Sequence, residues 1–229
     1  MKYLRAIGFS FSTIFIYLGI SLLGWGTDDL SGFFSLFPRG GYAAILISFG
    51  LALGYQAIDA PEGISGSKGE PGKLIKRQTL ISIFMTLLLF GMLFLLPWAD
   101  RHSFGTMSDN STIRWLGLLL SGAGYILIFW SGVALGKMYS AEVTVQKNHQ
   151  IVSSGLYRYI RHPRYLGLIL AGLGMSGLFR SWLGLAGFAA LVWILLLRIK
   201  DEEGLMRQEL GETWRAYCEH SWRLIPYIF

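Results

Sequence analysis

The chain has 229 residues, of which 53% are hydrophobic and only 15% are charged. This composition, with a mean hydropathy of +0.47, is typical of an integral membrane protein and excludes an ordinary soluble globular domain. The one cysteine, Cys218, excludes an internal disulfide and a cysteine-based metal site. We expect Cys218 to be a small apolar residue on a helix.

Apolar segments that approach the 20 or so residues of a membrane-spanning helix recur along the chain. Six spans are predicted, at residues 6–25, 41–58, 80–98, 115–135, 165–179 and 182–197. The third span is interrupted only by Ser82 and Thr86. The last two are short and are joined only by Arg180-Ser181, which predicts a tight helical hairpin. The first span lacks a small-residue cleavage site, so we interpret it as a retained span and not as a signal peptide.

The net charge of +6 is distributed unevenly over the loops between these spans. Sixteen of the 20 lysines and arginines lie on the side that carries both termini. The opposite side has only Arg39, Arg101, Arg114 and Arg180. Because Lys and Arg are enriched in cytoplasmic loops, this distribution predicts that both termini are cytoplasmic. The basic excess therefore indicates topology, and we do not expect nucleic-acid binding.

The loop between the second and third spans, residues 59–78, is rich in glycine and proline. This composition predicts a mobile connector, with a lid over a site as the alternative. The loop has neither a Gly-Lys-Ser/Thr sequence nor a flanking strand, so it is not a phosphate-binding loop.

Residues 201–219, which follow the sixth span, are predicted to form an amphipathic cytoplasmic helix. Its apolar face carries Met206, Leu210, Trp214, Tyr217 and Cys218. Such a helix can lie on the membrane or fold back over the bundle. We therefore predict an all-α integral membrane protein that forms one domain over residues 1–229. Residues 1–136 would supply scaffold spans and the acceptor pocket, and residues 137–229 a polar, cofactor-binding portion.

The most informative stretch is residues 155–167, with the sequence GLYRYIRHPRYLG, between the fourth and fifth spans. It places three arginines, one histidine and three tyrosines at the edge of the membrane. Pro163 disfavours a helical conformation for His162, so we expect His162 to be exposed to a ligand. Pro163 itself would lie in the first turn of the next helix. Gly167 would let a ligand or a neighbouring helix approach closely.

Two more polar clusters, residues 146–152 and 198–203, are predicted to lie near this stretch on the same membrane face. The three clusters offer hydrogen-bond acceptors, cations, a titratable ring and aromatic faces. This combination suits a bulky polar cofactor that carries both charges and an aromatic base. The sequence has no His-Glu-x-x-His or Cys-x-x-Cys motif and no Ser-His-Asp arrangement, and we expect no metal site.

Plainer interpretations are open for the same residues. Arg158, Arg161 and Arg164 could anchor anionic headgroups, and the tyrosines could form an aromatic belt. Arg198 could be an arginine at the end of a span that extends to the interface. The two glutamates after it could belong to a solvated helix face.

Residues 146–226 resemble the isoprenylcysteine carboxyl methyltransferase family and the related phospholipid N-methyltransferases. The matching motifs are His149-Gln150-Ile151-Val152, Ser154-Gly155-x-Tyr157, Arg161-His162-Pro163-x-Tyr165-x-Gly167, Arg198 with Glu202-Glu203, Gly211-x-x-Trp214-x-x-Tyr217 and Arg223-x-Ile225-Pro226. The Arg-His-Pro element alone is moderately specific. Its order relative to the spans, the double glutamate and the ending make the resemblance strong.

The resemblance implies an integral membrane enzyme that takes a methyl group from S-adenosylmethionine. It assigns the cofactor pocket to Gln146, His149, Val152, Tyr157, His162, Pro163, Arg164, Tyr165, Glu202 and Glu203. It also implies that Arg198 faces the acceptor carboxylate, so Arg198 and Glu202 are the expected catalytic residues. We expect a lipid-like acceptor, such as an isoprenylcysteine, to enter from the bilayer and the cofactor to enter from the cytoplasm.

Two kinds of acceptor are compatible with these residues. Methyl transfer from a sulfonium requires alignment and a dry, charged site more than a nucleophilic side chain. A carboxylate acceptor is ionised at neutral pH and needs no general base. An amine acceptor, as in phospholipid N-methylation, must first lose a proton, and Glu202 or Glu203 could accept it.

Two other classes of protein remain as alternatives. Sterol-type membrane reductases, which use NADPH, have a similar Arg-His-Pro element. They usually continue with an asparagine and a later glutamate, where this chain has Arg164 and Leu168. A transporter or scaffold is disfavoured, because transporters place charges near the middle of their spans and this chain has none there.

Overall fold

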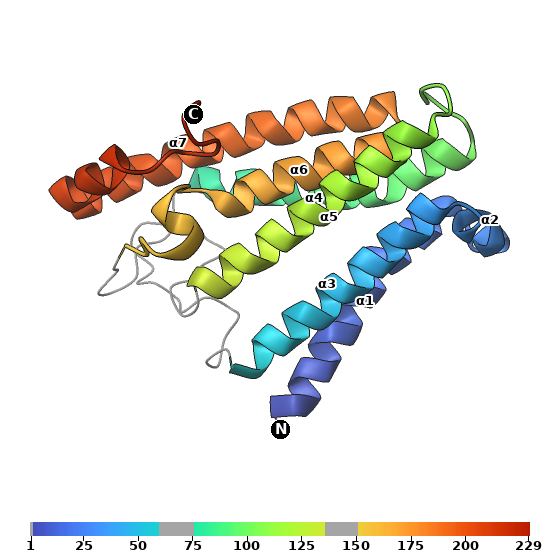
Figure 1. The fold of residues 1–229 in the computed structure, drawn as a ribbon, viewed down its shortest axis with the longest axis horizontal. Coiled ribbons are helices and arrows are strands. Elements are labelled where there is room, and N and C mark those ends of the chain that lie inside the picture. The colour runs from blue at the N-terminus through green and yellow to red at the C-terminus, as the bar shows by residue number, and fades with distance from the viewer. Residues whose placement is uncertain (1, 60–75, 136–150) are drawn as a thin grey trace.

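The computed structural model describes residues 2–59, 76–135 and 151–229 (Figure 1). The α-helices are α1 (Lys2–Trp25), α2 (Leu30–Phe34), α3 (Phe37–Asp59), α4 (Lys76–Arg101), α5 (Ser111–Leu135), α6 (Pro163–Leu178) and α7 (Trp182–Glu219). Two 3₁₀ turns are η1 (Thr27–Asp29) and η3 (Gly155–Arg158). Within these ranges the only β-type pairings are two isolated bridges, so the predicted all-α class is confirmed.

The six predicted spans correspond to α1, α3, α4, α5, α6 and α7. In the described part of the chain, five helices are long and apolar enough to cross a membrane. The sixth, α6, has 16 residues and is about 24 Å long at 1.5 Å per residue, which is shorter than a typical hydrocarbon core. Large apolar side chains on the helices face outward, among them Phe11, Phe84, Leu119 and Trp193. The protein is therefore an integral, multi-pass membrane protein.

The elements divide between two ends of the bundle. The short helix α2 and the 102–110 loop lie at one end, and the N-terminus, the beginning of α6 and the C-terminal part of α7 lie at the other (Figure 1). The helices α6 and α7 form the predicted hairpin, because α6 ends at Leu178 and α7 begins at Trp182. The stretch that precedes α6 is thereby placed beside the part of α7 that follows its apolar segment.

The C-terminal amphipathic segment is not a separate helix that begins near Asp201, as the sequence had suggested. It is the continuation of α7, which is interrupted only at Gly211 (φ 50°, ψ −119°). This backbone conformation favours glycine, and the residues from Leu197 to Leu210 include no proline that would end a helix. Arg198, Glu202 and Glu203 are therefore held on one rigid helix that extends from the membrane span.

The contact between α5 and α6 depends on small residues. A methyl group at Gly124 would lie 2.6 Å from the Gly167 carbonyl oxygen, and one at Gly167 would lie 2.8 Å from the Gly124 carbonyl oxygen. Helices in a membrane associate by such close backbone approach. The expectation for Gly167 is thus met by a neighbouring helix, which fixes the position of the start of α6.

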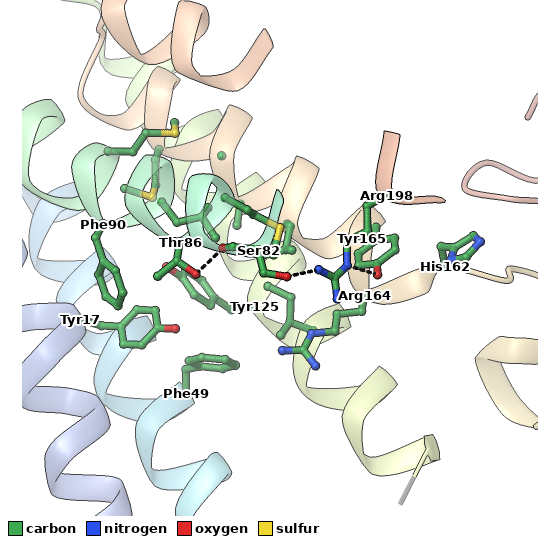
Figure 2. A pocket seen from close by; sticks show the side chains of 18 of the residues that line it. Tyr17, Phe49, Ser82, Thr86, Phe90, Tyr125, His162, Arg164, Tyr165 and Arg198 are labelled. Atoms are coloured by element: carbon green, nitrogen blue, oxygen red, sulfur yellow. Dashed lines mark hydrogen bonds between the residues drawn. The ribbon is translucent and has the colours of Figure 1, made fainter. Parts of the chain in front are cut away.

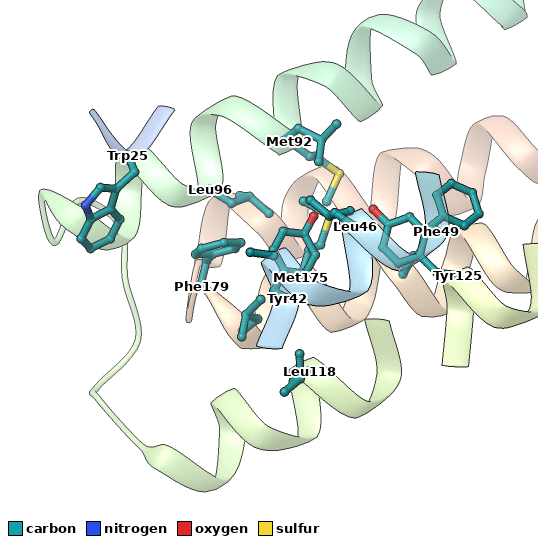
Figure 3. Packing of buried hydrophobic residues seen from close by; sticks show 14 of the residues in the cluster. Trp25, Tyr42, Leu46, Phe49, Met92, Leu96, Leu118, Tyr125, Met175 and Phe179 are labelled. Carbon is teal, nitrogen blue, oxygen red and sulfur yellow. The ribbon is translucent and has the colours of Figure 1, made fainter. Parts of the chain in front are cut away.

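The core lies where α3, α4, α5 and α6 meet (Figure 3). Tyr42 and Leu46 of α3 are fully buried, and Tyr42 packs edge-on against Phe179 with their ring centroids 5.6 Å apart. Leu96 of α4 and Met175 of α6 complete this contact. These contacts join α3 and α4 to the end of α6.

A buried ion cluster closes the end of the bundle that carries α2. The side chain of Asp100 in α4 is 1% exposed and accepts hydrogen bonds from Arg114 at 2.8 and 2.9 Å and from Arg180 at 2.7 Å. Arg39 lies 3.4 Å from the same carboxylate and stacks on Trp25 at 4.2 Å. Three of the four arginines on the sparsely charged side are thus used inside the protein.

Candidate functional site

A cavity of about 440 Å³ lies inside the bundle and has two chemically different ends (Figure 2). His162, Arg164, Tyr165 and Arg198 lie at the polar end, and Arg161 and Glu202 also line the cavity. Aromatic rings from the N-terminal helices line the other end. Pockets of this size usually hold one small molecule or part of a larger one. A ligand that fills this cavity would be charged at one end and apolar at the other.

His162 occupies the N-cap of α6, with Pro163 in the first turn as the sequence predicted. Its backbone is non-helical (φ −125°, ψ 55°). The residue is only 6% exposed to solvent, but it lines the cavity, where a ligand could reach it. Its ring stacks on Tyr165 with centroids 5.4 Å apart, and its Nε2 lies 3.4 Å from Glu203 Oε1. One side of the ring is thus held by the protein, while the residue still lines the cavity.

A chain of hydrogen bonds joins α4, α6 and α7 at the polar end of the cavity. Arg198 Nε donates to the Tyr165 hydroxyl at 2.8 Å, and that hydroxyl donates to Glu202 Oε2 at 2.7 Å. Arg198 Nη1 donates to Ser82 Oγ at 2.6 Å (Figure 2). Arg198 is 5% exposed, so its guanidinium is fixed in a dry environment. This arrangement contradicts the interpretation of Arg198 as an arginine that reaches to the interface.

Glu203 is buried behind the cavity and does not line it. Its carboxylate accepts hydrogen bonds from Arg161 Nε at 3.0 Å and from Arg223 Nε at 2.8 Å. Together with His162, these contacts join α7, the stretch before α6 and the C-terminal tail. Since two cations surround it, Glu203 acts as an internal counter-ion in this structure.

The C-terminal tail is bound along the stretch that precedes α6. The Arg161 amide donates to the Trp222 carbonyl at 2.7 Å, and the His162 amide donates to the Arg223 carbonyl at 3.0 Å. The Trp222 amide donates to the Tyr159 carbonyl at 2.9 Å. These backbone bonds hold a segment that has only the short turn η3 of its own. The tail therefore sets the conformation of Arg161 and His162, which line the cavity.

Tyr157 lies on η3 and is 7% exposed. Burial raises the pKa of its hydroxyl well above the ordinary value, so the group remains a neutral hydrogen-bond donor. Its backbone carbonyl accepts a hydrogen bond from Tyr217 at 2.6 Å. Tyr217, in the last turns of α7, thus holds the backbone of a residue that lines the cavity.

Four rings gather at the apolar end of the cavity (Figure 2). They are Tyr17 of α1, Phe49 of α3, Phe90 of α4 and Tyr125 of α5. The ring of Tyr17 lies 6.2 Å from that of Phe49 and 6.1 Å from that of Phe90, and the rings of Phe49 and Tyr125 are 4.9 Å apart. The N-terminal half thus shapes the apolar part of the pocket.

The residues predicted for the site have different positions in the structure. The cavity is lined by Tyr157, His162, Arg164, Tyr165, Arg198 and Glu202. Val152, Pro163 and Glu203 lie outside the lining. Gln146 and His149 fall outside the described residues. In the part of the chain that the structure describes, no three His, Cys, Asp or Glu residues are grouped as a metal site would require.

Sequence reasoning did not identify the residues that α4 contributes to the cavity. Ser82 and Thr86 are one helical turn apart and both line it. They were the only polar interruptions of the third span, and their spacing of four places them on one helix face. Two polar residues on one face of an otherwise apolar span are the signal that could have indicated a pocket there.

Known proteins are similar to this chain, most of all over the part that carries α5 to α7. Residues 115–208 match the isoprenylcysteine carboxyl methyltransferase (ICMT) family. A protein-S-isoprenylcysteine O-methyltransferase of Dictyostelium discoideum is 26% identical over 165 residues, which are 69% of this chain and 68% of that protein. The steroid 5-alpha-reductase DET2 of Solanum lycopersicum is 28% identical over 134 residues, which are 58% of this chain and 49% of that protein.

The fold resembles that of a solved structure of a eukaryotic intramembrane Ras methyltransferase. The TM-score is 0.55 at 17% sequence identity, and the match covers 97% of this chain and 77% of that chain. At this level of identity the likeness concerns the fold. The matched family segment begins in α5, so Ser82, Tyr17, Phe49 and Phe90 lie outside it.

Proposed function

We propose that this protein, which matches the isoprenylcysteine carboxyl methyltransferase family over residues 115–208, transfers a methyl group to the carboxylate of a lipid-like acceptor of the isoprenylcysteine type. One observation carries the proposal. Arg198, a buried cation, lies in the wall of a cavity that has a polar end and an aromatic end. A prenylated cysteine has the matching form, with an anionic carboxylate at one end of an apolar chain.

The acceptor carboxylate would be held by Arg198. A guanidinium can donate two parallel hydrogen bonds to a carboxylate, and such a pair is strong in a dry site. The contacts of Arg198 with Tyr165 and Ser82 orient its planar group before the acceptor arrives. Because the acceptor is already ionised near neutral pH, no side chain has to remove a proton. The role of Arg198 would be to align the attacking oxygen.

The methyl donor would be S-adenosylmethionine, and the polar end of the cavity fits its chemistry. Arg164 offers a cation for its carboxylate, Glu202 offers an anion for its cationic or hydroxyl groups, and Tyr157 offers an aromatic face. When bound, it would supply a methyl group on a positively charged sulfur, and transfer to a carboxylate oxygen would require no proton. Val152, Pro163 and Glu203 would support this end from outside the lining. Gln146 and His149 are proposed to complete it.

The proposed orientation puts the donor site and both termini on the cytoplasmic side. It is supported by the 16 basic residues that the sequence assigns to that side. It is also supported by the position of the N-terminus and the start of α6 at the same end of the bundle. The acceptor would reach the aromatic end of the cavity from the bilayer, since its apolar chain partitions there.

A sterol-type reductase is the second candidate, because the chain is also similar to a steroid 5-alpha-reductase. Calorimetric titration of the detergent-purified protein with S-adenosylhomocysteine, beside an identical titration with NADPH, separates the two classes. We expect saturable binding of S-adenosylhomocysteine and none of NADPH. The opposite result would replace the methyltransferase by the reductase. An amine acceptor, as in phospholipid N-methylation, is tested by the chemical stability of the methylated product.

A further inference from the structure

Ser82 is a polar residue within an apolar membrane-spanning segment, and the neighbouring sequence gives no reason for it. It lies on α4, in a largely apolar membrane-spanning helix, and it lines the cavity together with Thr86. Its Oγ accepts a hydrogen bond from Arg198 Nη1 at 2.6 Å across 116 residues of chain (Figure 2). A serine hydroxyl that accepts from a guanidinium still has its own proton to donate. The pair therefore presents an arginine and a hydroxyl donor to the same part of the cavity.

A second contact fixes the register of α4 against α7. Gln78, one turn before Ser82, donates through Nε2 to Asp201 Oδ2, and Gln78 is only 3% exposed. Residues 78 and 82 of α4 thus meet residues 201 and 198 of α7 in antiparallel order. Because two side-chain bonds hold this register, Ser82 cannot move along α7 away from Arg198 without breaking both.

We propose that Ser82 is a positioning residue that orients Arg198 and completes the acceptor-carboxylate subsite with a second hydrogen-bond donor. This inference rests on the proposed function and extends it to a helix outside the matched family segment. In this arrangement the acceptor carboxylate binds between the Arg198 guanidinium and the Ser82 hydroxyl. The methyl donor lies further along the polar end, towards Tyr165 and Glu202, and does not contact Ser82.

The test is the kinetics of Ser82→Ala with a farnesylated cysteine as acceptor. Loss of one hydrogen bond to a charged group in a dry site should raise the KM for the acceptor on the order of tenfold. The affinity for S-adenosylhomocysteine should stay within about twofold, since the donor does not touch this residue. Ser82→Thr keeps the hydroxyl and should recover most of the acceptor affinity. Ser21→Ala is the matched control: Ser21 is buried in α1, its hydroxyl donates to the Tyr17 backbone carbonyl, it does not line the cavity, and its loss should change neither constant.

A carboxamide analogue of the acceptor distinguishes a direct role of Ser82 from a structural one. If Ser82 only supported the fold, its loss would not change the preference for the carboxylate over the carboxamide. The wild-type protein should bind the carboxylate more tightly than the carboxamide, and Ser82→Ala should narrow that preference. An unchanged acceptor KM, or an equal loss of donor and acceptor binding that Ser82→Thr does not recover, would overturn the inference. A wild-type protein that fails to methylate the farnesylated cysteine would instead contradict the proposed function.

Discussion

The guanidinium of Arg198 and the hydroxyl of Tyr165 are joined by a hydrogen bond of 2.8 Å between two helices of the α6–α7 hairpin. The same hydroxyl donates to Glu202, so one phenol links the proposed acceptor subsite to the proposed donor subsite. In this chain of hydrogen bonds, Arg198 and Glu202 are linked only through the Tyr165 hydroxyl. The geometry of both proposed subsites thus depends on Tyr165, which does not itself react in the proposed methyl transfer.

Tyr165→Phe is expected to lower kcat/KM by about 10- to 100-fold, because the bridge between the two subsites is lost while the ring remains stacked on His162. The measurement is steady-state methyl transfer at varied concentrations of both substrates. Tyr159→Phe is the control, since Tyr159 is 54% exposed and does not line the cavity. Equal kinetics for Tyr165→Phe and the wild type would show that the bridge is not needed.

Glu203→Gln is expected to destabilise the protein, because it leaves Arg161 and Arg223 beside a neutral group. Removing one partner of a buried ion pair typically costs about 3–5 kcal/mol. The thermal midpoint in detergent should fall clearly. Glu212→Gln is the matched control, because Glu212 forms an exposed pair with Arg215. Midpoints that are the same for both variants would contradict the role of Glu203 as an internal counter-ion.

Asp100→Asn is expected to have a large effect on stability and none on the preference among ligands. The change would leave Arg39, Arg114 and Arg180 close together without their shared carboxylate, at the end of the bundle opposite the cavity mouth. The thermal midpoint should fall, while protein that remains folded should keep its affinity for S-adenosylhomocysteine. A large loss of that affinity in folded protein would mean that the two ends of the bundle are coupled.

Stability should decrease in acid through two carboxylates at the α2 end. Two hydrogen bonds from Arg101 hold the pKa of Asp28 at about 2, and a hydrogen bond from Arg114 lowers the pKa of Asp109. A carboxyl whose pKa is lower in the folded state stabilises that state above its unfolded value of about 4, and this contribution is lost as the pH falls through the folded value. The thermal midpoint should therefore decline between about pH 4 and pH 2.

Asp28→Asn and Asp109→Asn provide the control for this pH dependence. Each variant lacks one of the two carboxylates, so its thermal midpoint should decline less steeply in the same acid range. A double variant that declines as steeply as the wild type would assign the acid sensitivity to other groups.

The sequence was sufficient to predict the six long helices, five of which are long and apolar enough to cross a membrane, because long apolar runs bounded by charged loops leave few other structures there. It did not indicate where α7 is interrupted. The helix continues through Arg198 and Asp201, and the break comes at Gly211, because only there does the backbone adopt a conformation that favours glycine. In α7, the change from an apolar to an amphipathic pattern near Arg198 is therefore not the end of the helix.

Within the site, the sequence could not distinguish Glu202 from Glu203. Adjacent residues on a helix point about 100° apart, so one of the pair faces the cavity and the other faces the tail. Which one does so depends on where Arg161 and Arg223 lie, and these come from distant parts of the chain. The low solvent exposure of His162 could not be predicted for a related reason. The tail covers the stretch before α6, and its binding there depends on backbone bonds that no local pattern reveals.

Carboxyl methylation of a lipid-like acceptor is tested most directly by transfer of a labelled methyl group. The purified protein would be incubated with methyl-labelled S-adenosylmethionine and a farnesylated cysteine that has a free carboxylate. We predict labelled product whose label is released by mild base, as expected of a methyl ester, and a large loss of product with Arg198→Ala. Label that resists base would indicate N-methylation, and the absence of labelled product would contradict the account.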